Sequence, residues 1–259
     1  MTVQPPGEVV AAFAGGVPIE RLAGGRGVTW RAGSVVLRPA EELGETEWAS
    51  DVLSRLERSA EFAVPEPLRD DRGSWTRDGW HAQRWVPGTA DPSRVDDVVR
   101  AGEAFHRAMA HVPKPDFLER RDHPWARADR IAWGEEEAPR DALLDRLRAA
   151  YRPVHLPDQL IHGDVLGNVL FAADRPPVVI DWAPYWRPTA YASAIAVADA
   201  VCWHGYPLDR LASDHDITEW RQLLLRALVF RMATFHLLGA WSDDMTRRHA
   251  PVVQAVLAL

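Results

Sequence analysis

Short runs of β-forming residues dominate the first third of the chain, whereas apolar residues at helical spacing dominate the rest. The β-type runs lie between Gly and Pro residues and predict strands over 17–22, 28–31, 34–38, 64–68 and 80–86. The second and third of these flank Ala32-Gly33, which predicts a hairpin. Helical spacing predicts helices over 8–13 and 45–58. A β-rich first third therefore precedes an α-rich remainder.

The remainder of the chain is predicted to be mainly helical. Helices are expected over 93–111, 142–151, 190–203, 217–238 and 245–259, and short strands over 160–161, 169–171 and 178–180. Ser93 is the expected N-cap of the first of these helices. Gly102 lies on its apolar face and would let a neighbouring element approach closely. We predict the joint between two domains, 1–86 and 87–259, at Pro87-Gly88.

Composition and charge exclude several classes of protein. Apolar residues make up 47% of the 259 residues and charged residues 26%, as in a folded soluble protein. The net charge of −7 is opposite to what a nucleic-acid-binding protein needs, so no nucleic-acid partner is expected. No stretch approaches the ~18 consecutive apolar residues of a membrane span, and the start lacks a signal-peptide pattern. We therefore expect a cytoplasmic protein without a membrane partner.

The cysteine and lysine counts add two further observations. Cys202 is the single cysteine, which excludes an internal disulfide and a Cys-rich zinc site and fits a reducing compartment. Cys202 lies in an apolar run and is expected to be buried and unreactive. Lys114 is the single lysine among the 30 basic residues, so arginine is expected to stand wherever the chain needs only a positive charge.

Polar residues that carry chemistry interrupt the apolar strands late in the chain. His162-Gly163-Asp164 follows one predicted strand, Asn168 precedes the next, and Asp181 follows the third. Strand ends cannot bury unpaired charges cheaply, so these groups should converge on a cation, on a substrate or on each other. Asn168 and Asp181 are oxygen donors of the kind that Mg²⁺ prefers. The plainer alternative is a strand-to-turn junction in which Asp164 caps backbone N–H groups.

These residues carry a resemblance to a known family. His162-Gly163-Asp164, Asn168 and Ile180-Asp181-Trp182 resemble the motifs of the aminoglycoside phosphotransferase family, the antibiotic-kinase and choline-kinase-like relatives of protein kinases. The wider segment is similar to an actinobacterial branch of that superfamily. The resemblance implies a two-lobed α+β fold of protein-kinase type, with a small antiparallel sheet in the first lobe and a mainly helical second lobe.

The resemblance also implies an activity and a set of roles. The protein would transfer the γ-phosphate of ATP or GTP to a hydroxyl group of a small molecule, with Mg²⁺ as cofactor. Asp164 would be the catalytic aspartate, and His162 would support the loop that carries it. Asn168 and Asp181 would be the Mg²⁺ ligands. Asp199 would bond to the catalytic loop.

In the first lobe the resemblance implies the nucleotide site. Gly24, Gly25 and Gly27 would cover the phosphates, although a plain hairpin turn explains these glycines nearly as well. Trp85 and Val86 belong to a segment that resembles the hinge whose backbone pairs with the purine.

A charged pair completes the implied nucleotide site. Arg38 would contact the phosphates from the position where kinases carry a lysine. Glu47 would pair with it, with Asp51 as the alternative, and a surface ion pair is the competing interpretation.

Two departures from the family pattern leave the activity open. The family has four residues between the catalytic Asp and the Asn, whereas this chain has three between Asp164 and Asn168. Gly167 would allow a tighter path because glycine adopts positive φ at little steric cost. Arg38 in place of lysine keeps the charge but is bulkier. The alternative function is therefore a catalytically degenerate, nucleotide-binding regulatory protein, and nucleotidyl transfer is a third possibility.

The acceptor is not specified by any motif. Glu135, Glu136 and Glu137 could attract a cationic aminoglycoside, but a solvated acidic loop is the favoured interpretation. The aromatic residues after Asp181 could wall a substrate pocket or pack in the core; these are Trp182, Tyr185, Trp186 and Tyr191. Asp214-His215-Asp216 suggests a metal site, but a helix cap is favoured.

Overall fold

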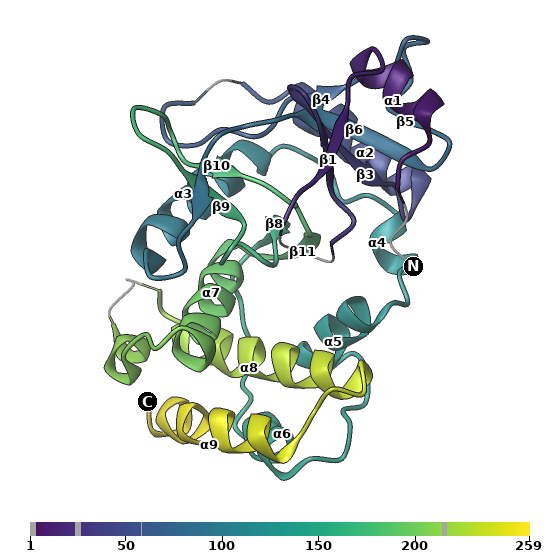
Figure 1. Cartoon of the computed structure of the whole chain (residues 1–259). Coiled ribbons are helices and arrows are strands. Elements are labelled where there is room, and N and C mark those ends of the chain that lie inside the picture. Colours follow the sequence, from purple (N-terminus) through teal and green to yellow (C-terminus); the bar gives the residue numbers. More distant parts are fainter. Residues whose placement is uncertain (1–3, 24–26, 58, 214–216) are drawn as a thin grey trace. The chain divides into compact units, whose positions relative to one another are not determined.

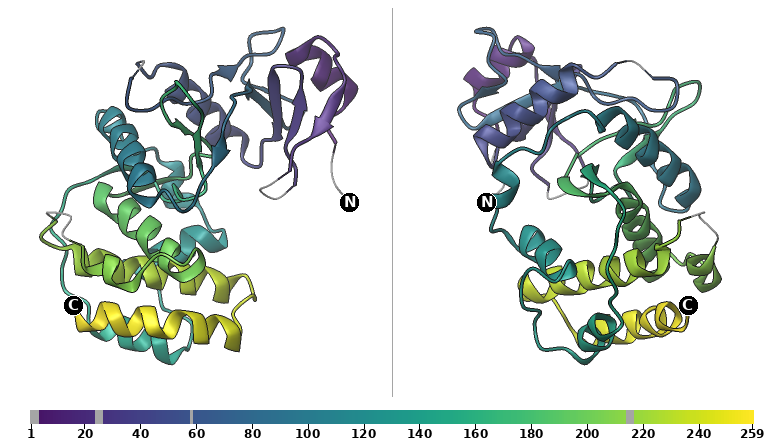
Figure 2. Two further views of the ribbon diagram at one scale, coloured as in Figure 1. Left: turned by 60° about the vertical axis from the view of Figure 1, so that its left-hand side comes forward. Right: turned by 180° about the vertical axis from the view of Figure 1, so that it is seen from behind.

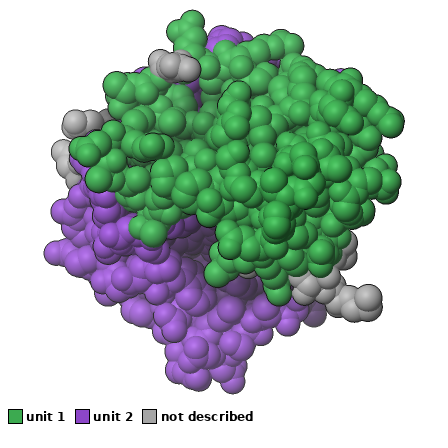
Figure 3. Space-filling view, turned by 45° about the horizontal axis from the view of Figure 1, so that its top comes forward, with its two compact units in different colours: residues 1–89, 170–180 green, residues 90–169, 181–259 purple. Residues whose placement is uncertain are grey.

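The computed structural model describes residues 4–23, 27–57, 59–213 and 217–259. These residues form two compact units, one made of residues 1–89 and 170–180 and the other of residues 90–169 and 181–259 (Figure 3). The chain therefore passes between the units more than once. Asp214-His215-Asp216, the suggested metal or cap segment, lies outside the described residues.

The first unit is built on an antiparallel sheet. Its strands follow the order β1-β2-β3-β6-β4, with β5 also paired to β6 (Figure 1). The strands are β1 (Ile19–Arg21), β2 (Trp30–Ala32), β3 (Val35–Pro39), β4 (Pro67–Leu68), β5 (Thr76–Arg77) and β6 (Trp80–Arg84). The predicted hairpin joins β2 to β3, and Gly33 in its turn has φ of 59°, which glycine adopts readily.

Two helices accompany this sheet. Helix α1 (Gly7–Ala14) buries Val9 and Val10 in the same core cluster as Leu37 of β3. Helix α2 (Leu43–Ser54) is four residues shorter at its end than the predicted helix over 45–58. Apolar side chains of the strands and of α1 therefore pack together as the core of the first unit.

A second, small sheet ties residues 170–180 to the first unit. Strands β7 (Thr89–Ala90), β9 (Val169–Phe171) and β10 (Val178–Val179) pair in the order β10-β9-β7. The backbone of Ala63 accepts from Val179 at 2.8 Å and donates to Pro177 at 2.8 Å. These bonds explain why residues 170–180 pack with the first unit, and the domain boundary at 86–87 stays a prediction.

The second unit is mainly helical. Its helices are α3 (Val95–Met109), α4 (Phe117–Arg120), α5 (Pro124–Ala132), α6 (Ala142–Ala149), α7 (Thr189–Trp203), α8 (Trp220–Leu237) and α9 (Asp243–Ala258), with a short 3₁₀ helix over Leu208–Ala212. Helices α7 and α8 are buried along most of their length and supply much of the apolar core of this unit. Both views in Figure 2 show α8 and α9 side by side.

A two-stranded antiparallel sheet in this unit positions the candidate site. Strand β8 (Asp158–His162) pairs with β11 (Pro184–Pro188), and His162 lies opposite Pro184. Strand β11 and helices α4 and α5 were not predicted, because several prolines lie in or beside their segments. Pro184 and Pro188 are tolerated because they stand at the two ends of a strand that pairs with β8 alone.

Helix α3 corrects one expectation and confirms another. Ser93 is not its N-cap, because the Ser93 hydroxyl donates to the Asp91 carboxylate at 2.6 Å and the helix begins after Arg94. Gly102 does allow a close approach, since a Cβ there would lie 3.4 Å from a methyl carbon of Val165. Val165 belongs to the loop that follows β8, so α3 packs directly beneath that loop.

The predicted α+β class is confirmed by this division into a small antiparallel sheet and a helical unit. Cys202 is 5% exposed, as its apolar surroundings predicted. Among the described residues, the helices fall short of the length and apolar character that crossing a membrane requires.

Candidate functional site

The loop from His162 to Asn168 leaves the end of β8 and makes one tight turn. The Asn168 N–H donates to the carbonyl of Val165 at 3.0 Å, which closes a four-residue turn. Gly167 stands at the third position of this turn with φ of +85°, as the shortened spacing predicted. The chain therefore closes the shortened loop with a conformation that glycine adopts readily.

The tight turn brings Asn168 back to Asp164. The Asn168 Nδ2 donates to the Asp164 carbonyl at 2.7 Å and to Asp164 Oδ2 at 3.2 Å. The amide nitrogen is thus engaged within the loop, and the amide oxygen, Oδ1, is the atom with which Asn168 can bind a cation. The two side chains are therefore hydrogen-bonded with only three residues between them.

Replacing Gly167 with alanine tests this turn. Alanine at φ of +85° costs about 1–2 kcal/mol of stability, although no atom lies within 4 Å of the added Cβ. Gly239→Ala is the matched control, because Gly239 also has positive φ and open space around it. Urea unfolding should show similar losses for both variants. Only Gly167→Ala should shift the NMR signals of the Asn168 side-chain amide, and unchanged signals would contradict this account.

The other carboxylate oxygen of Asp164 is held by an arginine. Arg231 Nη2 donates to Asp164 Oδ1 at 2.5 Å, and its Nε donates to Asp199 at 2.8 Å. Arg231 therefore links Asp199 to the side chain of Asp164. The Asp164 side chain remains 45% exposed, so solvent and small molecules have access to it. Sequence reasoning missed Arg231, and the only signal was an arginine between apolar residues in a predicted helix.

His162 is completely buried and supports the loop from below. Its Nδ1 accepts from the N–H of Asp164 at 3.2 Å and from the N–H of Ala183 at 3.4 Å. The backbone N–H of His162 donates to Nε2 of His106 on α3 at 2.9 Å. Burial, with the neighbouring His162 as a smaller cause, lowers the pKa of His106 to about 3. His106 is therefore neutral at physiological pH and can accept this bond.

The depressed pKa of His106 predicts a pH-dependent stability. Between its unfolded pKa of 6.5 and its folded pKa of about 3, only the unfolded chain binds a proton at this residue. The free energy of unfolding should therefore fall as the pH drops through this window, by about 1.4 kcal/mol per pH unit from this group. Urea unfolding of His106→Gln from pH 6 to pH 4 should show a shallower slope. Equal slopes in the two proteins would show that His106 does not contribute.

The middle residue of the His-Gly-Asp motif is glycine for a steric reason. A Cβ on Gly163 would lie 2.5 Å from a ring carbon of Tyr185, which is closer than real contacts allow. The Gly163 N–H also donates to the carbonyl of Ala183 at 3.0 Å. The Tyr185 ring thus covers the backbone directly beside Asp164.

Asp181 lies at the same end of the β8–β11 pair as Asp164. Asp164 follows β8 by two residues, and Asp181 precedes β11 by three. The chain after Asp181 is fixed to strand β8, because the Trp182 indole N–H donates to the carbonyl of Ile161 at 3.1 Å. Asp181 itself is exposed and has φ of 52°, a strained conformation for a residue other than glycine. Such strain is typical of functional sites.

The available donors fit a magnesium ion that is shared with a phosphate ligand. Asn168 offers its amide oxygen and Asp181 an exposed carboxylate, and both are hard oxygen donors. Within the described residues, no group of three His, Cys, Asp or Glu side chains is arranged to hold a metal by itself. Magnesium is usually bound through one or two carboxylates with water and phosphate completing its shell. The side chains are therefore suited to that mode of binding.

The predicted nucleotide residues lie in the first unit. Arg38 on β3 stands opposite His81 of β6. Burial, and secondly the charge of Arg38, lowers the pKa of His81 to about 4. Glu47 on α2 accepts a hydrogen bond from the Thr76 hydroxyl at 2.9 Å. Asp51, the alternative partner, forms an ion pair with Arg55 at 2.6 Å. The pairing of Arg38 with either carboxylate stays a prediction.

The hinge-like segment and the glycine loop also belong to the first unit. The Trp85 N–H donates to the carbonyl of Ser34 at 2.9 Å, directly after β6 ends, and Val86 follows. Gly27 has φ of 69°, and its carbonyl accepts from Arg21 Nε at 2.8 Å. Gly24 and Gly25 lie outside the described residues. The nucleotide-binding roles of these residues stay predictions.

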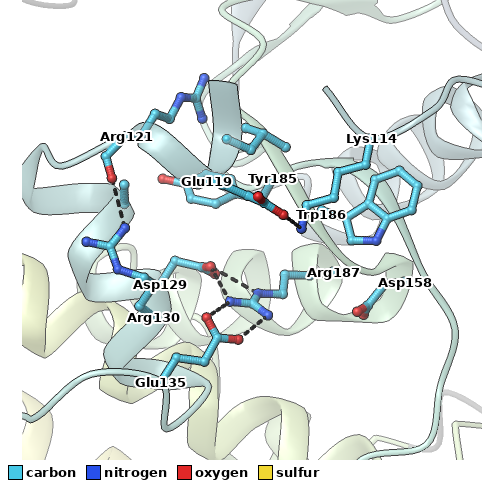
Figure 4. Close-up of a pocket in the computed structure, with 12 residues that line it drawn as sticks. Lys114, Glu119, Arg121, Asp129, Arg130, Glu135, Asp158, Tyr185, Trp186 and Arg187 are labelled. Carbon is cyan, nitrogen blue, oxygen red and sulfur yellow. Dashed lines mark hydrogen bonds and ion pairs between the residues drawn. The ribbon is translucent and has the colours of Figure 1, made fainter. Parts of the chain in front are cut away.

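A pocket of about 490 Å³ opens in the second unit beside β11 (Figure 4). Tyr185 and Trp186 line it, so two of the four aromatic residues after Asp181 do face a pocket. Tyr191 is 1% exposed and packs in the core instead. Tyr185 is the residue that relates the pocket to the loop of Asp164, because it lines the pocket and its ring also covers Gly163.

The charges around this pocket balance. Its lining contains four basic residues, Lys114, Arg121, Arg130 and Arg187, and four acidic ones, Glu119, Asp129, Glu135 and Asp158. Figure 4 shows the Arg187 guanidinium facing both Asp129 and Glu135. Arg187 Nη2 lies 2.8 Å from Asp129 Oδ2, and Arg187 Nη1 lies 2.7 Å from Glu135 Oε1. Glu136 pairs with Arg127 and Arg130. Glu135 and Glu136 are thus neutralised by arginines, which opposes a role in attracting cations.

Comparison with known proteins identifies the family. The model of the phosphotransferase enzyme family matches residues 21–185, which is more than half of the chain. That span contains the loop of Asp164 as well as Asp181. No curated protein sequence matches the chain.

Solved structures support the same fold. An aminoglycoside phosphotransferase from Alicyclobacillus acidocaldarius has a TM-score of 0.66 at 17% identity, covering 100% of this chain and 95% of its own. Amicoumacin kinase hAmiN has a TM-score of 0.63 at 13% identity, covering 96% and 91%. Spectinomycin phosphotransferase APH(9)-Ia has 0.57 at 13%, covering 97% and 96%. These likenesses confirm the predicted protein-kinase-like fold class, and by its family match the chain belongs to the phosphotransferase enzyme family.

Proposed function

We propose that this protein transfers the γ-phosphoryl group of ATP or GTP to a hydroxyl group of a small molecule. The observation that carries the proposal is the arrangement of Asp164. Its carboxylate is 45% exposed, while Arg231 holds one oxygen and Asn168 donates to the other. A carboxylate fixed in this way is suited to orienting an incoming hydroxyl. Phosphoryl transfer depends mainly on such positioning and on charge neutralisation.

Asp164 would act on the acceptor hydroxyl. The hydroxyl oxygen attacks the γ-phosphorus, and the bond from that phosphorus to the β–γ bridging oxygen breaks, releasing ADP or GDP. The hydroxyl proton passes to the Asp164 carboxylate. His162 supports this geometry from beneath, since its ring accepts from the Asp164 N–H.

Asn168 and Asp181 would hold Mg²⁺. When bound, the ion would neutralise charge on the nucleotide phosphates. Asn168 contributes its amide oxygen, because its nitrogen is engaged with Asp164. Asp181 contributes its exposed carboxylate.

The nucleotide would be bound by residues of the first unit. Arg38 would contact the phosphates with a guanidinium, which can offer two N–H groups to a phosphate. The complete proposed set is Gly24, Gly25, Gly27, Arg38, Glu47, Trp85 and Val86. Two relatives support a nucleotide donor, since spectinomycin phosphotransferase is known in complex with ADP and amicoumacin kinase in complex with AMP-PNP.

The acceptor would occupy the pocket beside β11. Tyr185 lines this pocket and also covers Gly163, the neighbour of Asp164, and Trp186 offers a second ring on which a planar or sugar-like group can stack. Its four acidic and four basic residues balance, so we propose a hydroxylated acceptor without a large positive charge. Two proteins of similar fold are known in complex with small hydroxylated molecules, spectinomycin and hygromycin B.

The second candidate function is a regulatory protein that binds nucleotide without catalysis. Arg38 in place of lysine is the observation that favours it. The shortened spacer is a second such observation, but the turn at Gly167, which brings Asn168 to Asp164, supports a working loop. We therefore rank catalysis first.

The experiment is a direct assay of transfer. The protein is incubated with Mg²⁺ and either ATP or GTP labelled at the γ-phosphate, alone and with hydroxylated compounds that are neutral, zwitterionic or polycationic. The proposal predicts label on one of the neutral or zwitterionic compounds, with ADP or GDP as co-product. Release of pyrophosphate would indicate nucleotidyl transfer instead. Nucleotide binding with no transfer to any compound or to water would favour the regulatory function.

A further inference from the structure

A largely buried arginine on α8 connects the candidate catalytic aspartate to the core of the second unit. Arg231 donates from Nε to both carboxylate oxygens of Asp199 on α7, at 2.9 Å and 2.8 Å. Its Nη2 donates to Asp164 Oδ1 at 2.5 Å. The side chains of Arg231 and Asp199 are 14% and 10% exposed, whereas that of Asp164 is 45% exposed. One cation thus joins a buried carboxylate to an accessible one.

Charge compensation alone does not explain this arrangement. A buried guanidinium needs a partner, and Asp199 already supplies one with both of its oxygens. Burial by itself would lower the pKa of Arg231, but Asp199 and then Asp164 raise it, so the guanidinium stays charged. With its additional bond to Asp164, the Arg231 guanidinium contacts two carboxylates. The bond to Asp164 therefore fixes the place of one of its carboxylate oxygens.

The geometry at Asp164 is fixed on both sides. Arg231 holds Oδ1, and the Asn168 Nδ2 donates to Oδ2 at 3.2 Å. Asn168 sits on a loop, whereas Arg231 projects from the middle of an 18-residue helix and is clamped by Asp199. The more rigid of the two supports is therefore the arginine.

We propose that Arg231 is a positioning residue for the reaction, which holds the Asp164 carboxylate facing the acceptor while Asp199 holds Arg231. This inference rests on the proposed function. A hydroxyl that meets a fixed carboxylate reacts faster than one that meets a rotating carboxylate, because the orientation is set before the reaction begins. Binding of the nucleotide does not involve Arg231 in this account.

The test compares three variants with the wild-type protein. Arg231→Met removes the cation, and Arg231→Lys keeps a charge that can reach one carboxylate. Asp199→Leu/Arg231→Met removes both buried charges, which avoids an unpaired carboxylate if the single variant fails to fold. Arg226→Met is the control, since Arg226 is a buried arginine on the same helix whose hydrogen bonds go to Gln222 and Arg152.

Two measurements decide the outcome. The rate of ADP formation with saturating Mg²⁺ and ATP should fall about 10- to 100-fold in Arg231→Met and in the double variant. Arg231→Lys should recover part of that loss, and Arg226→Met should leave the rate unchanged. Nucleotide affinity should stay within about twofold of wild type in all of them. Unchanged rates, or a parallel loss of affinity, would overturn the positioning role.

A crystal structure of the double variant separates this inference from the proposed function. The Asp164 side chain should turn away from its present direction or occupy more than one rotamer. If it keeps its present orientation, Arg231 does not position it. This readout holds even if the wild-type protein transfers no phosphate, in which case the proposed function fails and the structural result still decides the role of Arg231.

Discussion

Replacing Asp164 with asparagine is expected to lower the rate of phosphoryl transfer by about 10²- to 10⁴-fold, the usual contribution of a general base. The amide cannot take the hydroxyl proton at neutral pH. It also has one oxygen instead of two, so it cannot accept from both Arg231 and Asn168 as the carboxylate does. The measurement is the rate of ADP formation with saturating Mg²⁺ and ATP, with water or an identified acceptor.

The loss should be confined to the chemical step. Asp145→Asn, an exposed substitution on α6, is the control and should leave the rate unchanged. The affinity for Mg²⁺ and nucleotide should be similar in both variants. A rate within about threefold of wild type for Asp164→Asn would mean that another group acts on the hydroxyl.

Replacing Asp181 with asparagine should abolish the Mg²⁺-dependent part of nucleotide binding. A nucleotide at 100 times its dissociation constant stabilises the folded state by about 2.7 kcal/mol, and thermal unfolding detects this readily. In the wild-type protein, ATP with Mg²⁺ should stabilise much more than ATP with a chelator. In Asp181→Asn the two conditions should give the same melting temperature, because the exposed carboxylate that we assign to the ion is gone.

Asp174→Asn is a closely matched control for this substitution. Asp174 is also exposed and has φ of 57°, compared with 52° for Asp181, so asparagine meets the same backbone conformation at both sites. Asp174→Asn should keep the full Mg²⁺-dependent stabilisation. If Asp181→Asn keeps it as well, Asp181 is not a metal ligand. If Asp174→Asn loses it, the effect comes from the backbone.

The loop after β8 was largely predictable from sequence because its determinants are local. The His-Gly-Asp order, the three-residue spacer and Gly167 are adjacent in the chain, and positive φ at a glycine is a short-range property. The bond from Asn168 to Asp164 spans four residues, so the spacing alone constrained it. The same holds for the β2–β3 hairpin, which depends on Gly33.

Contacts between distant segments were beyond sequence reasoning. Arg231 lies 67 positions from Asp164, and no local pattern connects the two. Glu135 appeared to be a solvated residue because Arg187, its partner, is 52 positions away. In both cases the partner is fixed by how helices and strands pack, which one unaligned sequence does not reveal.

Strand β11 was missed for a different reason. Pro184 and Pro188 bound the segment, and proline normally argues against a strand. The pairing with β8 is possible because the prolines stand at the two ends, with Tyr185, Trp186 and Arg187 between them. This strand places Tyr185, which lines the pocket, against Gly163. The pocket that we propose for the acceptor was thus less predictable than the loop itself.

The central claim, that Asn168 and Asp181 together bind magnesium at the Asp164 loop, is tested most directly by a crystal structure with Mg²⁺ and a non-hydrolysable ATP analogue. The account predicts a metal ion with Asn168 Oδ1 and an Asp181 carboxylate oxygen both at about 2.0–2.1 Å, completed by phosphate oxygens and water. A bound nucleotide whose metal contacts neither side chain, or an Asn168 amide oxygen directed away from Asp181, would contradict it.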